Sequence, residues 1–266
     1  DDDQIRTLID ELIVKRELGT RKLVRFGWDK TADIRVANEQ LSLNSDGRPA
    51  GFTCKVDYDG HTIPLRLIHL YGRQQLYAIM AGLTTGITAG APLLTITQAL
   101  ENFEPPPGRG KLLEGVKDTW ILDDSYNASP VAVTAALETL KNFPCPGRKI
   151  AVLGDMLELG AYTIDAHREI GQQATKICDL LITVGVRAKF IADGARENGF
   201  EPKKLLHFDE PSRAGEGLEA LLISGDIVLV KGSQAVRLEK VVEEIMLHPE
   251  LKESLLARQE PEWQKR

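Results

Sequence analysis

The sequence has 266 residues, of which 42% are hydrophobic and 27% are charged, so it can bury the core of one large or two modest globular domains. The net charge is −6 and no long basic run occurs, which argues against a nucleic-acid partner. The longest apolar runs, such as residues 227–230, are too short to cross a bilayer and no signal peptide is recognised, so we expect no membrane insertion.

The first hundred residues mix helical and strand patterns. Apolar residues recur every three or four positions over 5–13, which predicts a helix. Strands are predicted at 23–26 and 34–37. An alternating pair of strands then flanks Asp59-Gly60, a hairpin signal because glycine supplies the positive φ that tight turns need. Two helices are predicted to follow, at 73–82 and 97–103. This half is predicted to contain antiparallel strands backed by helices.

Three prolines and two glycines crowd into residues 104–110, and this composition can continue neither a helix nor a central strand. We therefore predict a domain boundary here, with one domain over 1–105 and a second over 106–266. The alternative is a rigid surface loop inside a single domain.

The second half alternates short apolar runs with helical patterns. Strands are predicted at 119–122, 149–153, 180–184, 205–208 and 227–230. Helices are predicted between them, for example at 130–140, 167–178 and 188–198. This alternation is typical of an α/β domain with a doubly wound parallel sheet and helices on both faces. Ligands of such sheets bind at the carboxyl ends of the strands, so we look for function there.

A polar run follows the first of these strands. Ser129 can cap the next helix and Pro130 suits its first position. These roles leave unexplained the five preceding side chains, which are Asp123, Asp124, Ser125, Tyr126 and Asn127. A ligand-binding loop is our interpretation, and a simple turn is the alternative.

Four strand ends together resemble one protein family. Residues 123–130, DDSYNASP, are similar to the DDSYNANP loop of MurF-type members of the Mur ligase family, and 152–160 are similar to its VLGDMLELG segment. Residues 181–185 and 230–233 match two further segments in order. The similarity runs over roughly residues 1–250. It implies that 1–105 are the C-terminal part of a central ATP-binding domain and that 106–266 are a Rossmann-like C-terminal ligase domain.

The resemblance implies an ATP-dependent amide ligase of peptidoglycan precursor synthesis. Such an enzyme joins D-alanyl-D-alanine to UDP-N-acetylmuramoyl-tripeptide through an acyl phosphate. The expected cofactors are ATP and Mg²⁺, with the metal ligands expected upstream of this chain, and we expect a monomer. Three widely spaced cysteines, Cys54, Cys145 and Cys178, form no CxxC pair. They are predicted to be buried free thiols in a cytoplasmic protein, with no metal ligand in this chain.

The same resemblance implies roles for particular residues. Nucleotide-binding residues are expected at Arg109, Asp124, Tyr126 and Gln75. Substrate-binding residues are expected at Asn127, Asp155, Lys231 and Ser233. We assign no catalytic residue within the chain.

Structural alternatives remain open for several of these residues. Arg109 could be a solvated linker residue instead of a phosphate ligand that acts when the domains close. Asp155 could be a helix cap, and Lys231 could be a surface lysine. His167 matches a histidine of the family, but a helix-surface role is the simpler expectation.

The sequence also departs from the family. No Gly-x-x-x-x-Gly-Lys-Ser/Thr loop occurs, so we expect an incomplete piece of a longer protein that is inactive as a ligase by itself. The family's Gly-Arg-His-Asn-x-x-Asn segment is Gly-Arg-Gln-Gln-Leu-Tyr-Ala here. Gln75 keeps an amide in place of the first asparagine, whereas Ala78 cannot replace the second. Gln234 stands where the family carries arginine.

Two other classes of function stay open on these residues. A nucleotide-dependent dehydrogenase would fit the alternating pattern, but it needs a Gly-x-Gly-x-x-Gly turn, and residues 153–156 contain one glycine. A non-catalytic binding module derived from a Mur ligase would fit Gln74, Gln75 and Ala78. Related ligases for a diamino acid or for folate are less favoured, because their Asp-Asn-Pro-Arg motif and their histidine-containing loop do not occur.

Overall fold

A computed structural model describes residues 3–14, 23–45 and 48–264. The described residues divide into two compact units. Unit 1 draws on Asp1–Leu70 and Gln74–Phe103, and unit 2 on Tyr71–Arg73 and Glu104–Arg266. In the part of the chain so described, no helix is long and apolar enough to span a membrane.

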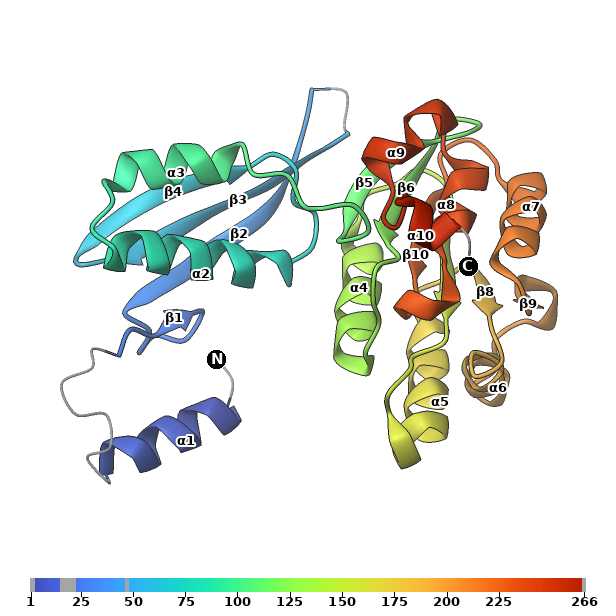
Figure 1. Cartoon of the computed structure of the whole chain (residues 1–266), viewed down its shortest axis with the longest axis horizontal. Coiled ribbons are helices and arrows are strands. Elements are labelled where there is room, and N and C mark those ends of the chain that lie inside the picture. The colour runs from blue at the N-terminus through green and yellow to red at the C-terminus, as the bar shows by residue number, and fades with distance from the viewer. Residues whose placement is uncertain (1–2, 15–22, 46–47, 265–266) are drawn as a thin grey trace. The chain divides into compact units, whose positions relative to one another are not determined.

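Unit 1 is a small sheet covered by helices (Figure 1). Its sheet has the order β1-β2-β3-β4, in which β1 runs parallel to β2 and the other pairs are antiparallel. The predicted strand at 23–26 is reduced to Phe26 and its neighbour Gly27. The elements are α1 (Asp3–Val14), β1 (Phe26–Gly27), β2 (Ile34–Leu43), β3 (Pro49–Tyr58), β4 (His61–Leu67), α2 (Gln75–Thr88) and α3 (Leu93–Glu101).

The predicted hairpin joins β3 to β4. Asp59 and Gly60 have φ values of 48° and 75°, as a two-residue turn with both central residues left-handed requires, and Tyr58 pairs with His61. The core of this unit forms where the buried face of α2, with Leu76, Met80 and their neighbours, meets alternate residues of the sheet.

Unit 2 is a three-layer α/β domain whose sheet has the order β5-β6-β10-β7-β8-β9. Five strands are parallel, and β5, which the sequence patterns did not predict, runs antiparallel to β6 at the edge. The elements are β5 (Lys111–Gly115), β6 (Thr119–Asp124), α4 (Pro130–Asn142), β7 (Lys149–Gly154), α5 (Thr163–Ala174), β8 (Leu180–Val184), α6 (Lys189–Glu197), β9 (Leu205–Phe208), α7 (Pro211–Leu221), β10 (Ile227–Lys231), α8 (Glu239–Ile245), α9 (Lys252–Leu255) and α10 (Pro261–Gln264), with short 3₁₀ turns between some of them.

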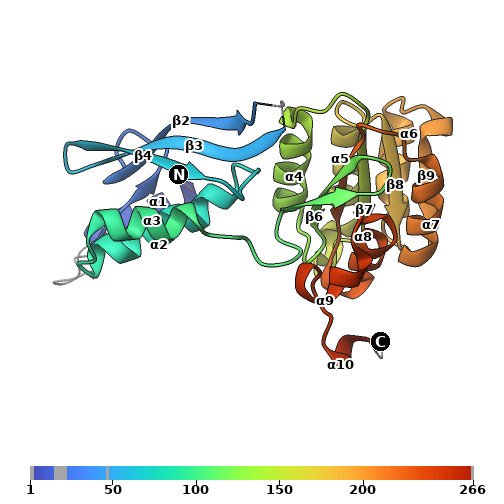
Figure 2. The same cartoon turned by 90° about the horizontal axis from the view of Figure 1, so that it is seen from above.

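Two hydrophobic cores cover the two faces of this sheet. All five residues of β8 and of β10 are buried, as expected for parallel strands packed on both sides. Helices α4, α5 and α6 supply one core, and α7 and α8 supply the other. Figure 2 shows the sheet between these helix layers. The predicted doubly wound fold class is therefore confirmed.

The strand order places a switch point at the middle of the sheet. β10, the last strand described, lies between β6 and β7. The chain leaves β6 and β7 toward the face covered by α4, α5 and α6, and it leaves β10 toward the face covered by α8. Lys231, at the end of β10, pairs in register with Asp124 of β6 and with Leu153 of β7. Ligands of open α/β sheets bind outside the carboxyl ends of the strands at such a point.

Three sequence expectations need correction. The helix predicted at 97–103 spans Leu93–Glu101, because it begins directly after Pro92. The helix predicted at 167–178 spans Thr163–Ala174, because a 3₁₀ turn at Gly160–Tyr162 leads directly into it and starts it four residues earlier. Cys54 and Cys178 are buried free thiols as predicted, and burial raises the pKa of Cys178 to about 12. Cys145 is also free but only partly buried, since it lies in the loop after α4 rather than in a core element.

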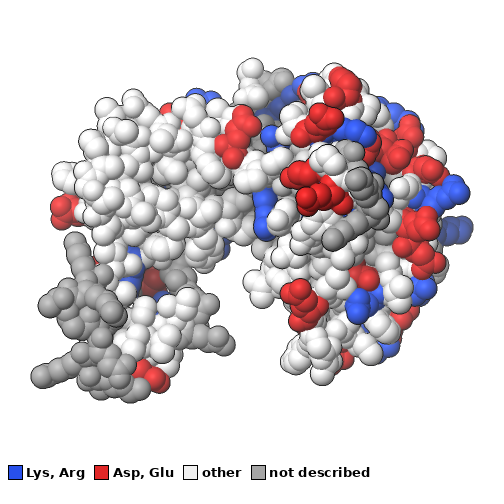
Figure 3. Space-filling model, in the orientation of Figure 1, with Lys and Arg blue, Asp and Glu red and all other residues white. Residues whose placement is uncertain are grey.

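The charged side chains are distributed unevenly between the units. Figure 3 shows acidic and basic side chains intermingled over unit 2, while the visible surface over α2 and α3 is mostly uncharged. The sequence explains this contrast, because α2 contains no charged residue and α3 contains only Glu101.

Candidate nucleotide and substrate site at the ends of the parallel strands

Asp124 and Lys231 form an ion pair where β6 and β10 end. Lys231 Nζ donates to Asp124 Oδ2 at 2.6 Å and to the main-chain oxygen of Asn127 at 2.9 Å. The Asp124 side chain is 16% exposed and the Lys231 side chain is 4% exposed. Lys231 is therefore not a surface lysine, and its ammonium holds the loop after β6 in place.

One oxygen of Asp124 remains open to a ligand. Burial raises the pKa of Asp124, and the Lys231 ammonium and Arg109 act in the opposite direction. Oδ2 is occupied by Lys231, whereas Oδ1 accepts no hydrogen bond from any described residue of the chain. A hydroxyl donor is the natural partner for such an oxygen.

Arg109 and Tyr126 stack beside this pair. The Arg109 guanidinium carbon lies 4.2 Å from the centre of the Tyr126 ring, a cation–π contact, and Arg109 is exposed. Gly108 allows the approach: its carbonyl accepts from Tyr126 N at 3.1 Å, and its φ is +71°. A Cβ at this position would lie 3.0 Å from Tyr126 N, so a side chain would push the two segments apart.

Asp123 and Ser125 lie beneath the loop and are fully buried. Asp123 Oδ1 accepts from Ser125 N at 3.1 Å, but Asp123 Oδ2 and Ser125 Oγ have no hydrogen-bond partner among the residues that the structure describes. Burial raises the pKa of Asp123 to about 6, and the nearby Asp124 and Glu239 carboxylates act in the same direction. The side chain of Asp123 therefore supports the loop from inside, whereas Asp124 faces the site.

Asn127 and Ser233 connect the loop to its neighbours. The exposed Asn127 uses Oδ1 to accept from Ala128 N at 2.9 Å. Ser233 Oγ accepts from Leu157 N at 2.9 Å and lies 3.4 Å from the Ala128 carbonyl oxygen. The loops after β6, β7 and β10 are thus joined through the Ser233 hydroxyl.

Asp155 caps the segment after β8. Its Oδ1 accepts from Ala188 N, at the start of α6, at 2.7 Å, and Oδ2 lies 4.0 Å from exposed Arg187. Gly185 is required beside it, since a Cβ there would approach the carboxylate within 2.7 Å. The geometry matches the helix-cap alternative considered for this residue.

His167 is buried, which differs from the expected helix-surface position. Its Nε2 accepts from Met156 N at 3.0 Å, and Nδ1 lies 2.6 Å from the Thr163 carbonyl oxygen, to which it donates in the neutral tautomer. Burial lowers the pKa of His167, which favours that neutral form. The ring therefore shapes the loop after β7.

Gln75 is the one predicted site residue that lies in unit 1, where it begins α2. It is partly buried, and Ala78 is exposed one turn further on. The other seven predicted residues all lie in unit 2. Five of them, Arg109, Asp124, Tyr126, Asn127 and Lys231, are linked by the contacts described above.

Sequence patterns missed one charged cluster at this site. Arg258 donates to the carbonyl oxygens of Ser125 at 2.8 Å and of Tyr126 at 3.0 Å. Its guanidinium also pairs with Glu239 at 2.7 Å. The only signal in the sequence was an arginine beside the apolar pair Leu256 and Ala257, which is too common a pattern to single out.

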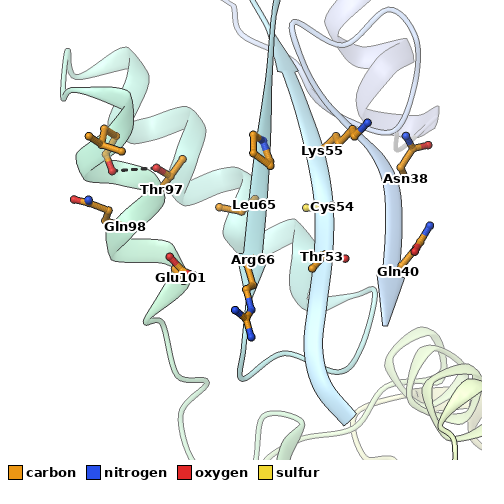
Figure 4. A pocket seen from close by; sticks show the side chains of 12 residues that line it. Asn38, Gln40, Thr53, Cys54, Lys55, Leu65, Arg66, Thr97, Gln98 and Glu101 are labelled. Atoms are coloured by element: carbon orange, nitrogen blue, oxygen red, sulfur yellow. Dashed lines mark hydrogen bonds between the residues drawn. The ribbon is translucent and has the colours of Figure 1, made fainter. Parts of the chain in front are cut away.

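Two further features bear on ligands. Among the described residues, no group of three or more His, Cys, Asp or Glu side chains could hold a metal ion. A hollow of about 680 Å³ lies in unit 1 between α3 and the sheet, where Figure 4 shows Gln98 and Glu101 on the helix side and Thr53 and Arg66 on the strands. None of the eight predicted site residues lines this hollow, so we place the site at the strand ends.

Comparisons with known proteins point to one family. Residues 108–234 match the family model for the Mur ligase glutamate ligase domain. The UDP-N-acetylmuramoyl-tripeptide–D-alanyl-D-alanine ligase of Bacillus subtilis (strain 168) is 30% identical over 184 residues, which are 68% of this chain and 40% of that protein. The ligase of the same name from Escherichia coli (strain K12) is 31% identical over 231 residues, 85% of this chain and 47% of that protein.

Solved structures show the same relationship. MurF ligase from Thermotoga maritima, in complex with ADP, superposes with a TM-score of 0.71 at 28% identity, covering 92% of this chain and 52% of that chain. A MurF from Acinetobacter baumannii gives a TM-score of 0.72 at 21% identity, covering 87% and 48%, and this likeness concerns the fold alone. The chain spans about half the length, or less, of these relatives. Residues 108–234 are therefore a Mur ligase C-terminal domain, and the chain as a whole is a relative of the MurF-type ligases.

Proposed function

We propose that this chain contributes the nucleotide- and dipeptide-facing part of an ATP-dependent amide ligase, which adds D-alanyl-D-alanine to UDP-N-acetylmuramoyl-tripeptide. The Mur ligase match over 108–234 supports the reaction class. Curated relatives named for this reaction support the substrates. The dehydrogenase alternative has no such support and is not pursued.

The observation that carries the proposal is the half-satisfied carboxylate of Asp124 at the switch point of the sheet. Lys231 binds Oδ2 and fixes the carboxylate, and Oδ1 is left to accept a hydrogen bond. A ribose hydroxyl of ATP is the donor that we assign to it, because a fixed acceptor next to a strand end suits a nucleotide sugar. Tyr126 and Arg109 lie beside this position with an aromatic face and a planar cation.

The chemistry proceeds in two steps. A carboxylate oxygen of the tripeptide attacks the γ-phosphorus of ATP, and ADP leaves. The amine of D-alanyl-D-alanine then attacks the acyl carbon, loses a proton and expels phosphate. This chain's residues hold and orient the reactants, which is a large part of catalysis in phosphoryl transfer. Arg109 is the residue that we assign to the phosphate side, since it is an exposed arginine that lies against the Tyr126 ring and acts electrostatically on Asp124.

Mg²⁺ belongs to the proposal through ATP, whose phosphate charge it would offset. The described residues do not form a cage of three or more ligands for it, so we assign no metal-binding residue here. Lys231 is occupied by Asp124 and Asn127, and therefore its proposed part in substrate binding is to fix the loop that carries them. A monomer in the cytoplasm remains part of the proposal, and the three free thiols support that location.

Titration of this chain with Mg-ATP by calorimetry tests the nucleotide assignment. In Asp124→Asn the amide keeps a contact for Lys231 but replaces the charged acceptor, so affinity should fall by roughly tenfold. The matched control is Asp193→Asn, an exposed acidic residue on α6 paired with Arg196. Equal Mg-ATP affinity in the wild type and Asp124→Asn would contradict the assignment. Titration with D-alanyl-D-alanine in the same way tests the substrate side.

A further inference from the structure

The C-terminal segment inserts an arginine under the loop that carries Asp124 and Tyr126. Arg258 follows α9, and its side chain is 2% exposed. One terminal nitrogen donates to the Ser125 carbonyl at 2.8 Å and the other donates to the Tyr126 carbonyl at 3.0 Å. Two successive peptide groups of the loop are therefore held by a single guanidinium.

A carboxylate holds the guanidinium in turn. Glu239, at the start of α8 and 1% exposed, accepts from Arg258 Nη2 at 2.7 Å and from Nε at 3.1 Å. The second oxygen of Glu239 pairs with Arg237. Each oxygen of Glu239 is thus occupied by an arginine, and the fork of Arg258 has one orientation available to it.

A buried pair of Arg258 and Glu239 is not expected to add much to the stability of the fold. Burying ions is expensive, and buried ion pairs often stabilise no more than apolar residues of similar volume would. Arg258 also has φ of +60°, a conformation that a residue with a side chain adopts at a cost. Such a group is better explained by the conformation that it imposes on its partners.

We propose that Arg258 is a positioning residue, which together with Glu239 holds residues 123–127 in the conformation that presents Asp124 and Tyr126 to a nucleotide. The claim that this conformation serves a nucleotide rests on the proposed function, whereas the claim that Arg258 holds the loop does not. Asp124 precedes the two held carbonyls and Tyr126 bears one of them. Two guanidinium groups also contact the Tyr126 ring, with Arg109 at 4.2 Å and Arg258 at 5.4 Å from its centre.

Two substitutions separate charge from geometry. Arg258→Lys keeps a cation but cannot reach Glu239 and both carbonyls at once, because all the donors of an ammonium radiate from one nitrogen, whereas the guanidinium spreads its donors over three. Arg258→Met keeps much of the side-chain length and removes all donors. The controls are Arg196→Met, an exposed arginine on α6, and Leu218→Ala, a core truncation in α7 that lowers the melting temperature without touching the loop.

Two measurements on the whole chain test whether Arg258 positions the loop. Hydrogen exchange follows the amides of residues 123–129 against those of β8, and calorimetry gives the dissociation constant for Mg-ATP. We expect both Arg258 variants to speed loop exchange selectively and to weaken Mg-ATP binding by roughly tenfold, with lysine recovering part of the loss. Leu218→Ala should leave both readouts unchanged after allowance for its lower melting temperature.

The outcomes distinguish this proposal from the proposed function. If loop exchange in both Arg258 variants equals that of the wild type, or rises only as much as in Leu218→Ala, the positioning role is overturned. If the wild type does not bind Mg-ATP, the proposed function fails, and the exchange data alone decide whether Arg258 holds the loop. If exchange rises but Mg-ATP affinity does not change, the claim that this conformation serves the nucleotide is overturned.

Discussion

The loops after β6 and β7 begin alike and differ in what their polar groups do. Each follows a buried strand with an aspartate near its start, and each matches a family motif. After β7, Asp155 Oδ1 and both ring nitrogens of His167 bind main-chain groups of unit 2, and Asp155 Oδ2 lies 4.0 Å from exposed Arg187. After β6, Asp124 keeps one carboxylate oxygen without a partner in the described chain, and exposed Arg109 stacks on Tyr126.

The difference shows that a motif match alone does not separate ligand-binding residues from residues that build the loop. Both kinds are polar and both lie at strand ends. What separates them is how each aspartate is held. A main-chain N–H and Arg187 face the two oxygens of Asp155, whereas Lys231 takes one oxygen of Asp124 and the other has no hydrogen-bond donor among the described residues. By this criterion we propose that the loop after β6 faces ligands and that the loop after β7 is scaffold.

The largest expected effect concerns Asp123, the buried carboxyl beneath the loop after β6. Its folded pKa of about 6 lies above the ordinary value of 3.8, so the stability that it contributes is present below pH 3.8 and is lost as the pH rises through 6. Asp123→Asn removes this loss, about 3 kcal/mol by pH 7. Urea unfolding at pH 4.5 and pH 7.5 measures the part lost between these values, about 2 kcal/mol. A difference between variant and wild type that does not grow with pH would show that Asp123 is not titrating in this range.

Asp155→Ala should lower the free energy of unfolding by about 2 kcal/mol, because Ala188 N loses a charged acceptor in a buried position. If the loop after β7 is scaffold, Mg-ATP affinity should stay the same. Urea unfolding and calorimetry on one preparation give both numbers. A variant of normal stability with weakened binding would place Asp155 among the ligand-binding residues.

His167→Gln should lower the free energy of unfolding by about 1.5 kcal/mol at pH 8, since the amide cannot serve Met156 N and the Thr163 carbonyl together. The folded pKa of His167 is lowered, so its contribution is present above the unfolded value of about 6.5 and is lost as the pH falls below it. The gap between variant and wild type should therefore shrink by pH 5. A constant gap would mean that the ring is not held in its neutral form.

The smallest change in stability is expected for Arg109→Met, about 0.5 kcal/mol, because an exposed cation–π contact is weak. Mg-ATP binding should nevertheless weaken several-fold if Arg109 serves the phosphate side. Arg213→Met, an exposed arginine on α7, is the control. A variant that loses stability but keeps its affinity for Mg-ATP would place Arg109 among the residues that build the loop.

Much of the fold could be predicted from the sequence, because periodicity and turn chemistry are local. The strands at 180–184 and 205–208 and the Asp59-Gly60 hairpin occur as predicted. The edge strand β5 was missed, since its five residues follow a glycine-rich linker and carry little pattern. The position of β10 between β6 and β7 depends on pairing over long distances in the chain, which periodicity does not report.

The site could be predicted in outline for a similar reason. Strand ends identified the region of Asp124 and Tyr126, and family resemblance added Lys231. The actual partners could not be read from residue types: Lys231 pairs with Asp124, and Ser233 bridges main-chain groups. Arg258 escaped notice because it lies more than a hundred residues from the loop that it holds.

The insertion of the last strand between two earlier ones has a consequence for how unit 2 must be made. Until Ile227–Lys231 has been synthesised, β6 and β7 have no strand between them, and each presents an unsatisfied edge that can recruit another chain. The sheet closes only when its final strand enters this gap. Assembly of the domain and completion of the candidate site are therefore a single late event, and a nascent chain stopped before that strand would be prone to aggregate.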